Sequence, residues 1–252
     1  MQPEKLNERL SLISTPWSLV CRASHGPAEE MTSARQQLLE RYGGAVERYL
    51  SKRLHDPEAA DEVFQEFALQ LVQGDLRGAN PRRGRFRDFV KGTLFHLIAD
   101  YRKRQRHWPE PLPGDGAALA ANPEEVESDR QFVEGWCDEL LARAWAALAD
   151  SEARAGQPLY AVLRFRADHP EMRSPHMAEQ LTALLRRPFT AAGVRQILHR
   201  AREKFANLLL DEVTDSLENP TAELLEQELA DLGLLDYCQP ALKRRGLHGV
   251  TA

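Results

Sequence analysis

Apolar residues recur every three to four positions along nearly all of this chain, and that spacing limits the fold more than any other feature. It is the period of an α-helix with one buried face. Between residues 57 and 73 it places Val63, Phe64, Phe67 and Leu71 on one side. No segment shows the strict alternation that indicates a half-buried strand, and no Asn-Gly pair marks a hairpin turn. We therefore predict an all-α protein.

Residues 107–128 break this pattern. They are rich in Pro, Gly and Ala and have no amphipathic period, which is typical of a linker. Their charged residues are all carboxylates: Glu110, Asp115, Glu124, Glu125 and Glu127. We predict two helical domains joined by a flexible acidic linker. The expected parts are an N-terminal extension (1–32), a first domain (33–106), the linker (107–128), a second domain (129–210) and an acidic C-terminal extension (211–252).

Positive charge is concentrated at the end of the first domain, although the whole chain has a net charge of −5. The cations between residues 76 and 106 are Arg77, Arg82, Arg83, Arg85, Arg87, Lys91, Arg102, Lys103, Arg104 and Arg106. Only Asp88 and Asp100 oppose them in this stretch. Binding of an anion responds to the local field, so the cluster favours an anionic partner such as nucleic acid.

The cluster includes a predicted helix over 86–106 with two distinct faces. The helical period places its apolar residues on one broad face: Phe86, Phe89, Val90, Leu94, Leu97, Ile98 and Tyr101. Phe95 falls on the opposite side, near Lys91, Arg102 and Arg106. An aromatic ring among cations is typical of a platform for single-stranded nucleic acid, where bases stack and phosphates pair. The alternative is that Phe95 packs on the loop at 76–85 and the charges only solvate the helix.

The second domain contains two helices joined by a tight turn. The first starts at Ser174 and runs to about Leu185, and Thr190 caps the second. The second helix opens with polar residues that lie off its apolar stripe: Arg195, Gln196, His199 and Arg200. Two helices in this order indicate a helix-turn-helix, whose second helix reads base edges in the major groove. The alternative is a helical hairpin that binds nothing.

Together these segments resemble RNA polymerase sigma factors of the extracytoplasmic-function type, from about Gln36 to Leu210. The family motif A-E-D-L-V-Q-E-V-F corresponds to residues 60–68, which read ADEVFQEFA. In the next motif Phe86, Asp100 and Lys103 match, while Phe89 replaces a Trp and His96 an Asn. The last motif corresponds to Gly193-Val194 followed by residues 200–202, which read RAR.

The resemblance implies three sets of site residues. Contacts to core RNA polymerase are expected from Asp61, Glu62, Gln65 and Glu66. Contacts to the minus-ten element of promoter DNA are expected from Asn80, Arg82, Arg83, Arg85, Phe86, Lys91, Phe95 and Arg102. Contacts to the minus-thirty-five element are expected from Arg195, Gln196, His199 and Arg200. The function implied is promoter recognition and melting at transcription initiation, with no catalysis, metal or cofactor of the chain's own.

Two other functions are weighed against this one. A stand-alone helix-turn-helix regulator would bind DNA without joining the polymerase, and only the helix at 57–73 and the stacking platform argue against it. An enzyme is suggested by His96 and Asp100, which have a metal-ligand spacing, but no third ligand and no nucleotide-binding loop is evident.

The remaining expectations concern the surroundings of the protein. Three scattered cysteines fit free thiols in a reducing cytoplasm, and no apolar run is long enough for a membrane span. The acidic segment after residue 210 predicts either a packed tail or an apolar stripe that binds a partner. An anti-sigma protein or another regulator could bind the chain through its N- and C-terminal extensions. The carboxylates of the acidic segment are also expected to mask the basic second domain.

Overall fold

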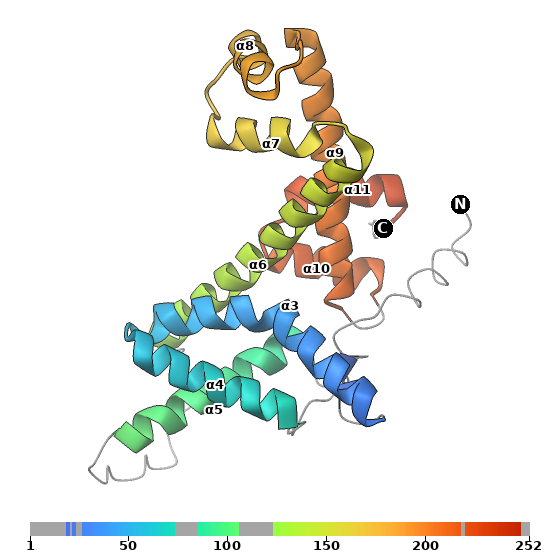
Figure 1. The fold of residues 1–252 in the computed structure, drawn as a ribbon. Coiled ribbons are helices and arrows are strands. Elements are labelled where there is room, and N and C mark those ends of the chain that lie inside the picture. Colours follow the sequence, from blue (N-terminus) through green and yellow to red (C-terminus); the bar gives the residue numbers. More distant parts are fainter. Residues whose placement is uncertain are drawn as a thin grey trace. The chain divides into compact units, whose positions relative to one another are not determined.

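The computed structural model describes residues 19–20, 22–23, 27–73, 85–105, 123–217 and 220–247. Every regular element in these ranges is an α-helix, so the all-α prediction is confirmed for them (Figure 1). By their internal contacts the residues fall into two compact units. The first consists of Met1–Glu139 and Asp215–Pro220, and the second of Leu140–Thr214 and Thr221–Ala252.

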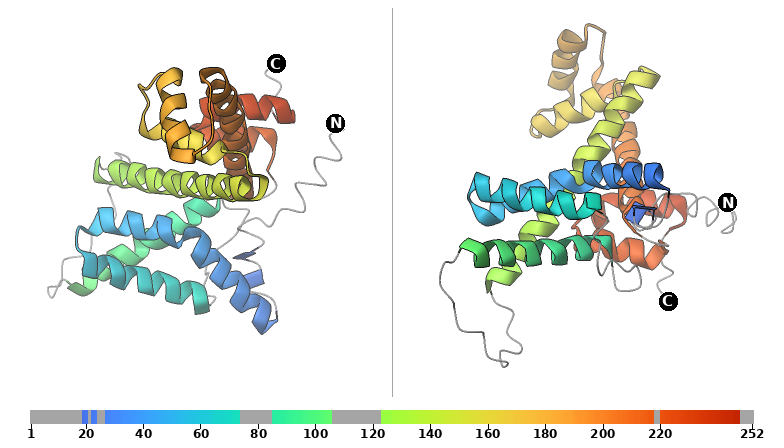
Figure 2. Two further views of the ribbon diagram at one scale, coloured as in Figure 1. Left: turned by 45° about the horizontal axis from the view of Figure 1, so that its top comes forward. Right: turned by 60° about the horizontal axis from the view of Figure 1, so that its bottom comes forward.

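The first unit contains α3 (Ala28–Leu54), α4 (Pro57–Gln73) and α5 (Phe86–Gln105). Helix α4 packs against both of the others (Figure 2). Helix α3 ends at Leu54, and the next residue, His55, has a left-handed backbone with φ of 53°. Asp56 then accepts a hydrogen bond from the Glu58 backbone N–H at 3.0 Å, and Pro57 takes the first helical position. The predicted helix over 57–73 is therefore confirmed.

Two consecutive glycines lie inside α3 without interrupting it. The reason for Gly44 is close contact with α6: a Cβ there would lie 2.8 Å from Oε2 of Glu139. The same carboxylate binds Arg48 one turn along α3. Gly44 therefore leaves space for an approaching side chain.

Helix α6 (Pro123–Ala155) begins inside the segment predicted to be linker. Pro123 suits a first helical position, which accounts for the early start. The rest of the predicted linker, residues 107–122, lies outside the described residues. In the first unit, Trp136 stacks on Tyr42 with ring centroids 4.9 Å apart, and Phe132 meets Tyr49 edge-on at 5.3 Å. Residues 129–139, which the sequence placed in the second domain, thus contribute to the first unit.

The second unit combines the remainder of α6 with α7 (Leu159–Asp168), α8 (Ser174–Leu185) and α9 (Ala191–Asp215). Its core is built from apolar side chains that recur at helical spacing. The most deeply buried include Leu148, Val162, Met177, Leu181, Val194, Leu209 and Leu210. The periodicity that predicted helices at 174–185 and from Thr190 onward therefore also predicted which faces are buried.

The C-terminal segment folds as two short helices, α10 (Ala222–Asp231) and α11 (Leu235–Arg245). Thr221 caps α10 by accepting a hydrogen bond from the Leu224 backbone N–H at 3.3 Å. The pair packs along α9: Arg245 donates to the side-chain oxygen of Asn207 at 2.8 Å, and Tyr237 lies edge-on to Phe205 at 6.0 Å. Of the two alternatives for this segment, the structure shows the packed tail.

Candidate nucleic-acid interface and partner surface

Helix α5 separates its apolar and charged residues as predicted. Phe86, Val90, Leu94, Leu97 and Ile98 are buried. Phe95 is 55% exposed on the other side. Lys91 lies one turn before Phe95 and the exposed Arg102 two turns after it, so a ring and two cations share one face. This arrangement can stack an unpaired base and pair with its phosphates.

Phe86 does not belong to that surface. Only 1% of Phe86 is exposed. Its ring lies 4.9 Å from that of Tyr42. Its side chain contributes to the core here, and its expected contact to DNA stays a prediction. Arg87, counted among the cations available to an anion, is also buried at 5% exposure. The core predictions were too broad at two positions, because Phe89 and Tyr101 are only partly buried.

The remaining predicted contacts to the minus-ten element are spread over the start of α5 and the segment before it. Arg85 is described, and its Nε lies 3.1 Å from the carboxylate of Asp88. Asn80, Arg82 and Arg83 lie outside the described residues. Apart from Arg85 and the buried Phe86, the described residues of this set are Lys91, Phe95 and Arg102, and we call the face that they form the α5 charged face.

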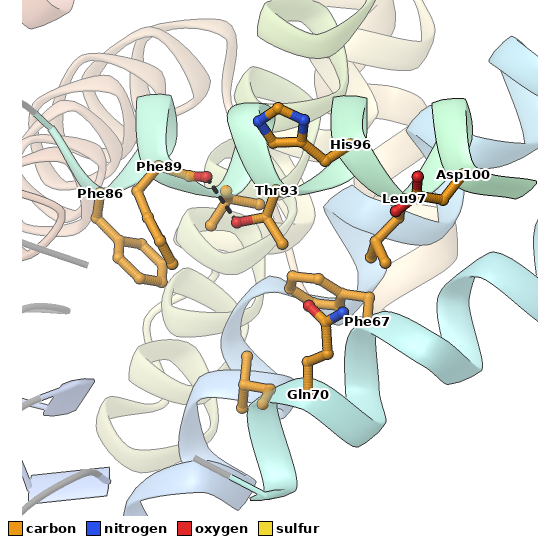
Figure 3. A pocket seen from close by; sticks show the side chains of 10 residues that line it. Phe67, Gln70, Phe86, Phe89, Thr93, His96, Leu97 and Asp100 are labelled. Carbon is orange, nitrogen blue, oxygen red and sulfur yellow. Dashed lines mark hydrogen bonds between the residues drawn. The ribbon is translucent and has the colours of Figure 1, made fainter. Parts of the chain in front are cut away.

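A pocket of about 230 Å³ opens between α4 and α5 in the first unit (Figure 3). Its walls combine three aromatic rings with polar groups: Phe67, Phe86, Phe89, Gln70, Thr93, His96 and Asp100. His96 and Asp100 thus line one cavity, as their spacing allowed. Within the described ranges, however, no group of three or more His, Cys, Asp or Glu side chains could hold a metal ion. The pocket offers polar and aromatic contacts, and it holds no such ligand cluster.

The outer face of α4 carries the residues expected to contact the polymerase. Asp61, Glu62 and Gln65 are exposed, while Glu66 is partly buried. Arg104 of α5 binds Glu66 at 2.8 Å and Glu62 at 3.6 Å. The hydrogen bond that Arg104 donates to the Glu66 carboxylate is the main cause of the raised pKa of the Arg104 guanidinium. Two of the four expected residues therefore also connect α4 to α5.

Two apolar residues extend this face and were missed by the sequence analysis. Leu69 is 53% exposed and Val72 is 49% exposed. With Glu62 and Gln65 they follow the helical spacing of a single stripe along α4. The signal was present in the sequence, since both residues lie off the buried stripe of Val63, Phe67 and Leu71.

In the second unit, a short connection joins α8 to α9, and threonine hydroxyls stabilise it by accepting backbone hydrogen bonds. Arg186 ends α8 in a left-handed conformation with φ of 51°. Thr182 Oγ1 accepts a hydrogen bond from the Phe189 backbone N–H at 2.9 Å. Thr190 Oγ1 accepts one from the Gly193 backbone N–H at 3.0 Å, as a cap does. The start of α9 is thereby fixed relative to the end of α8.

The four residues expected to contact the minus-thirty-five element are all exposed near the start of α9: Arg195, Gln196, His199 and Arg200. Val194, Leu198 and Ala201 anchor the helix from its opposite side. The first turns of α9 thus present two guanidinium groups, an amide and an imidazole, a set that can donate to and accept from base edges.

Comparison with known proteins gives no assignment: the chain matches no family model, no curated protein and no solved structure. Among the described helices, none combines the length and apolar content that crossing a membrane requires. Functional conclusions therefore depend on the α5 charged face, the outer face of α4 and the exposed start of α9.

Proposed function

We propose that this protein is a sigma factor of the extracytoplasmic-function type, which binds core RNA polymerase and directs it to promoters. The observation that carries the proposal is the α5 charged face, where an exposed aromatic ring lies between cations. A phenyl ring that leaves the core at this position gains nothing from burial, but it can stack on a base freed from the duplex.

The start of α9 supports the same function. In the proposal α8 and α9 form a helix-turn-helix, and Arg195 and Gln196 reach base edges of the minus-thirty-five element in the major groove. The acidic and apolar stripe on α4 supplies the contact to the polymerase. The protein itself carries out no chemistry, because the polymerase performs catalysis.

Reconstituted transcription tests this function directly. Purified core RNA polymerase is mixed with the protein and a pool of templates with random upstream sequences, and run-off transcripts are sequenced. We expect transcription that depends on the protein and an enrichment of two sequence elements. If the protein binds specific duplexes but neither joins the polymerase nor supports transcripts, it is instead a stand-alone regulator.

A further inference from the structure

The first half of α6 brings a carboxylate to the α5 charged face. Asp129 Oδ2 lies 2.7 Å from Nζ of Lys91, the cation one turn before Phe95. Both side chains remain partly open to solvent, with 38% of Lys91 and 55% of Asp129 exposed. The ammonium that is best placed to take a phosphate beside Phe95 is therefore already paired within the chain.

This contact is not an isolated surface ion pair, because α6 is anchored in the same unit. One and two turns beyond Asp129, Phe132 and Trp136 are buried against Tyr49 and Tyr42. One turn further, Glu139 binds Arg48. These contacts hold the start of α6 beside α5, so the effective concentration of the Asp129 carboxylate near Lys91 is high.

We infer that the start of α6 is an autoinhibitory element, in which Asp129 occupies Lys91 and competes with the phosphates of single-stranded DNA. The inference rests on the proposed function, since it requires the α5 charged face to bind DNA. A carboxylate and a phosphate are alternative partners for one ammonium group, and both cannot neutralise it at once. The face becomes fully available when the first turns of α6 move away from it.

The strength of the pair suits a reversible block. An exposed ion pair changes a binding equilibrium by up to about fivefold. A DNA strand that is already bound nearby can therefore displace the Asp129 carboxylate from Lys91. Glu127, which precedes Asp129 in α6 and is exposed, has the same charge sign. Its carboxylate extends the region that repels a DNA strand when α6 is docked.

Binding of the full chain to a fluorescein-labelled single-stranded oligonucleotide tests the inference by anisotropy. Asp129→Ala should raise affinity about twofold to fivefold at low salt, because Lys91 becomes available. The plot of log affinity against log salt should steepen by about 0.7, the value expected for one additional phosphate contact. Asp138→Ala is the matched control, because it removes an exposed carboxylate nine residues further along α6. Thermal melting should be unchanged in both variants.

A second comparison separates a direct block from a general effect of charge. Lys91→Ala should weaken binding of the oligonucleotide. In the Lys91→Ala background, adding Asp129→Ala should raise the affinity no more than adding Asp138→Ala does. An equal rise in both backgrounds would overturn the inference. If wild type binds, Lys91→Ala weakens binding and Asp129→Ala has no effect, the face binds DNA without the block. If neither wild type nor Asp129→Ala binds at the lowest salt, both the proposed interface and the block are wrong.

Discussion

Phe95 is the residue on which the proposed contact with unpaired DNA depends most. Because its ring is 55% exposed, removing it should leave the fold intact. Stacking on a base contributes about 1–3 kcal/mol, so Phe95→Ala should lower affinity for single-stranded DNA roughly fivefold to a hundredfold. In the transcribing complex the same change should reduce permanganate reactivity of promoter thymines more than it reduces closed-complex formation.

Phe86→Ala provides the matched control, since it removes an identical ring from the opposite face of the same helix. Only 1% of Phe86 is exposed, and a buried Phe→Ala change costs about 3–5 kcal/mol of stability. Its effect should appear in thermal melting. If the Phe95→Ala protein opens a fully duplex promoter normally, Phe95 does not stack on a base, and α5 contacts only phosphates.

Arg195 is the residue to which we assign the proposed base contact of the second unit. It is exposed one position after the buried Val194, at the capped start of α9. Arg195→Ala should relax selectivity at one position of the upstream promoter element by about 1–3 kcal/mol. Lys204→Ala, which changes an exposed cation two to three turns further along, should weaken binding evenly across sequences. An unchanged base preference in a promoter library would show that Arg195 does not read bases.

At the scale of helices, the sequence predicted most of what local periodicity determines. The helices at 57–73 and 86–105 and the exposed position of Phe95 follow directly from residue spacing. The burial of Arg87 does not, because it depends on which residues distant in the chain pack over this part of α5. Periodicity also cannot show that Gly44 leaves space for Glu139, since that contact joins positions 95 residues apart, as 139 − 44 gives.

The contact between α3 and α6 predicts a difference between two Gly→Ala changes. A Cβ at Gly92 of α5 would meet nothing within 4 Å, so Gly92→Ala should stabilise the protein by about 1 kcal/mol through helix propensity. Gly44→Ala should stabilise it less, because the new Cβ displaces the Glu139 carboxylate that binds Arg48. Chemical denaturation measures both. In a Glu139→Ala background, Gly44→Ala should raise the free energy of unfolding as much as Gly92→Ala does. If the two changes stabilise the wild-type protein equally, α6 does not approach α3 at Gly44.

The outer stripe of α4 predicts how the polymerase contact can be weakened without loss of fold. Glu66 is a poor target because it binds Arg104, whereas Gln65 and Leu69 are exposed on the same stripe. Gln65→Ala combined with Leu69→Ala should reduce co-purification with core polymerase and leave circular dichroism unchanged. The same pair of changes should not alter binding to isolated DNA. Undiminished assembly with the polymerase would exclude this stripe as the contact.

At the scale of the whole molecule, two of the acidic residues after position 210 form ion pairs that composition could not reveal. Asp211 binds Arg245 at 2.5 Å, and Glu212 binds Arg143 at 2.6 Å. Glu228 is buried with only 1% exposed. These carboxylates contribute to the packing of the second unit, which argues against a free acidic tail that covers the proposed DNA-binding residues of α9.

Removal of α10 and α11 distinguishes these two roles. A chain that ends at Leu217 lacks the buried Leu225, Leu229 and Leu242, and it leaves Asn207 and Asp211 without Arg245. Exposure of apolar surface on α9 should lower the melting temperature and increase binding of a hydrophobic dye. A chain that ends at Leu247 is the control and should melt like the full protein. If the shorter chain instead melts normally and binds promoter DNA more tightly at low salt, the segment masks the second unit by its charge, because charge repulsion is strongest where screening is weakest.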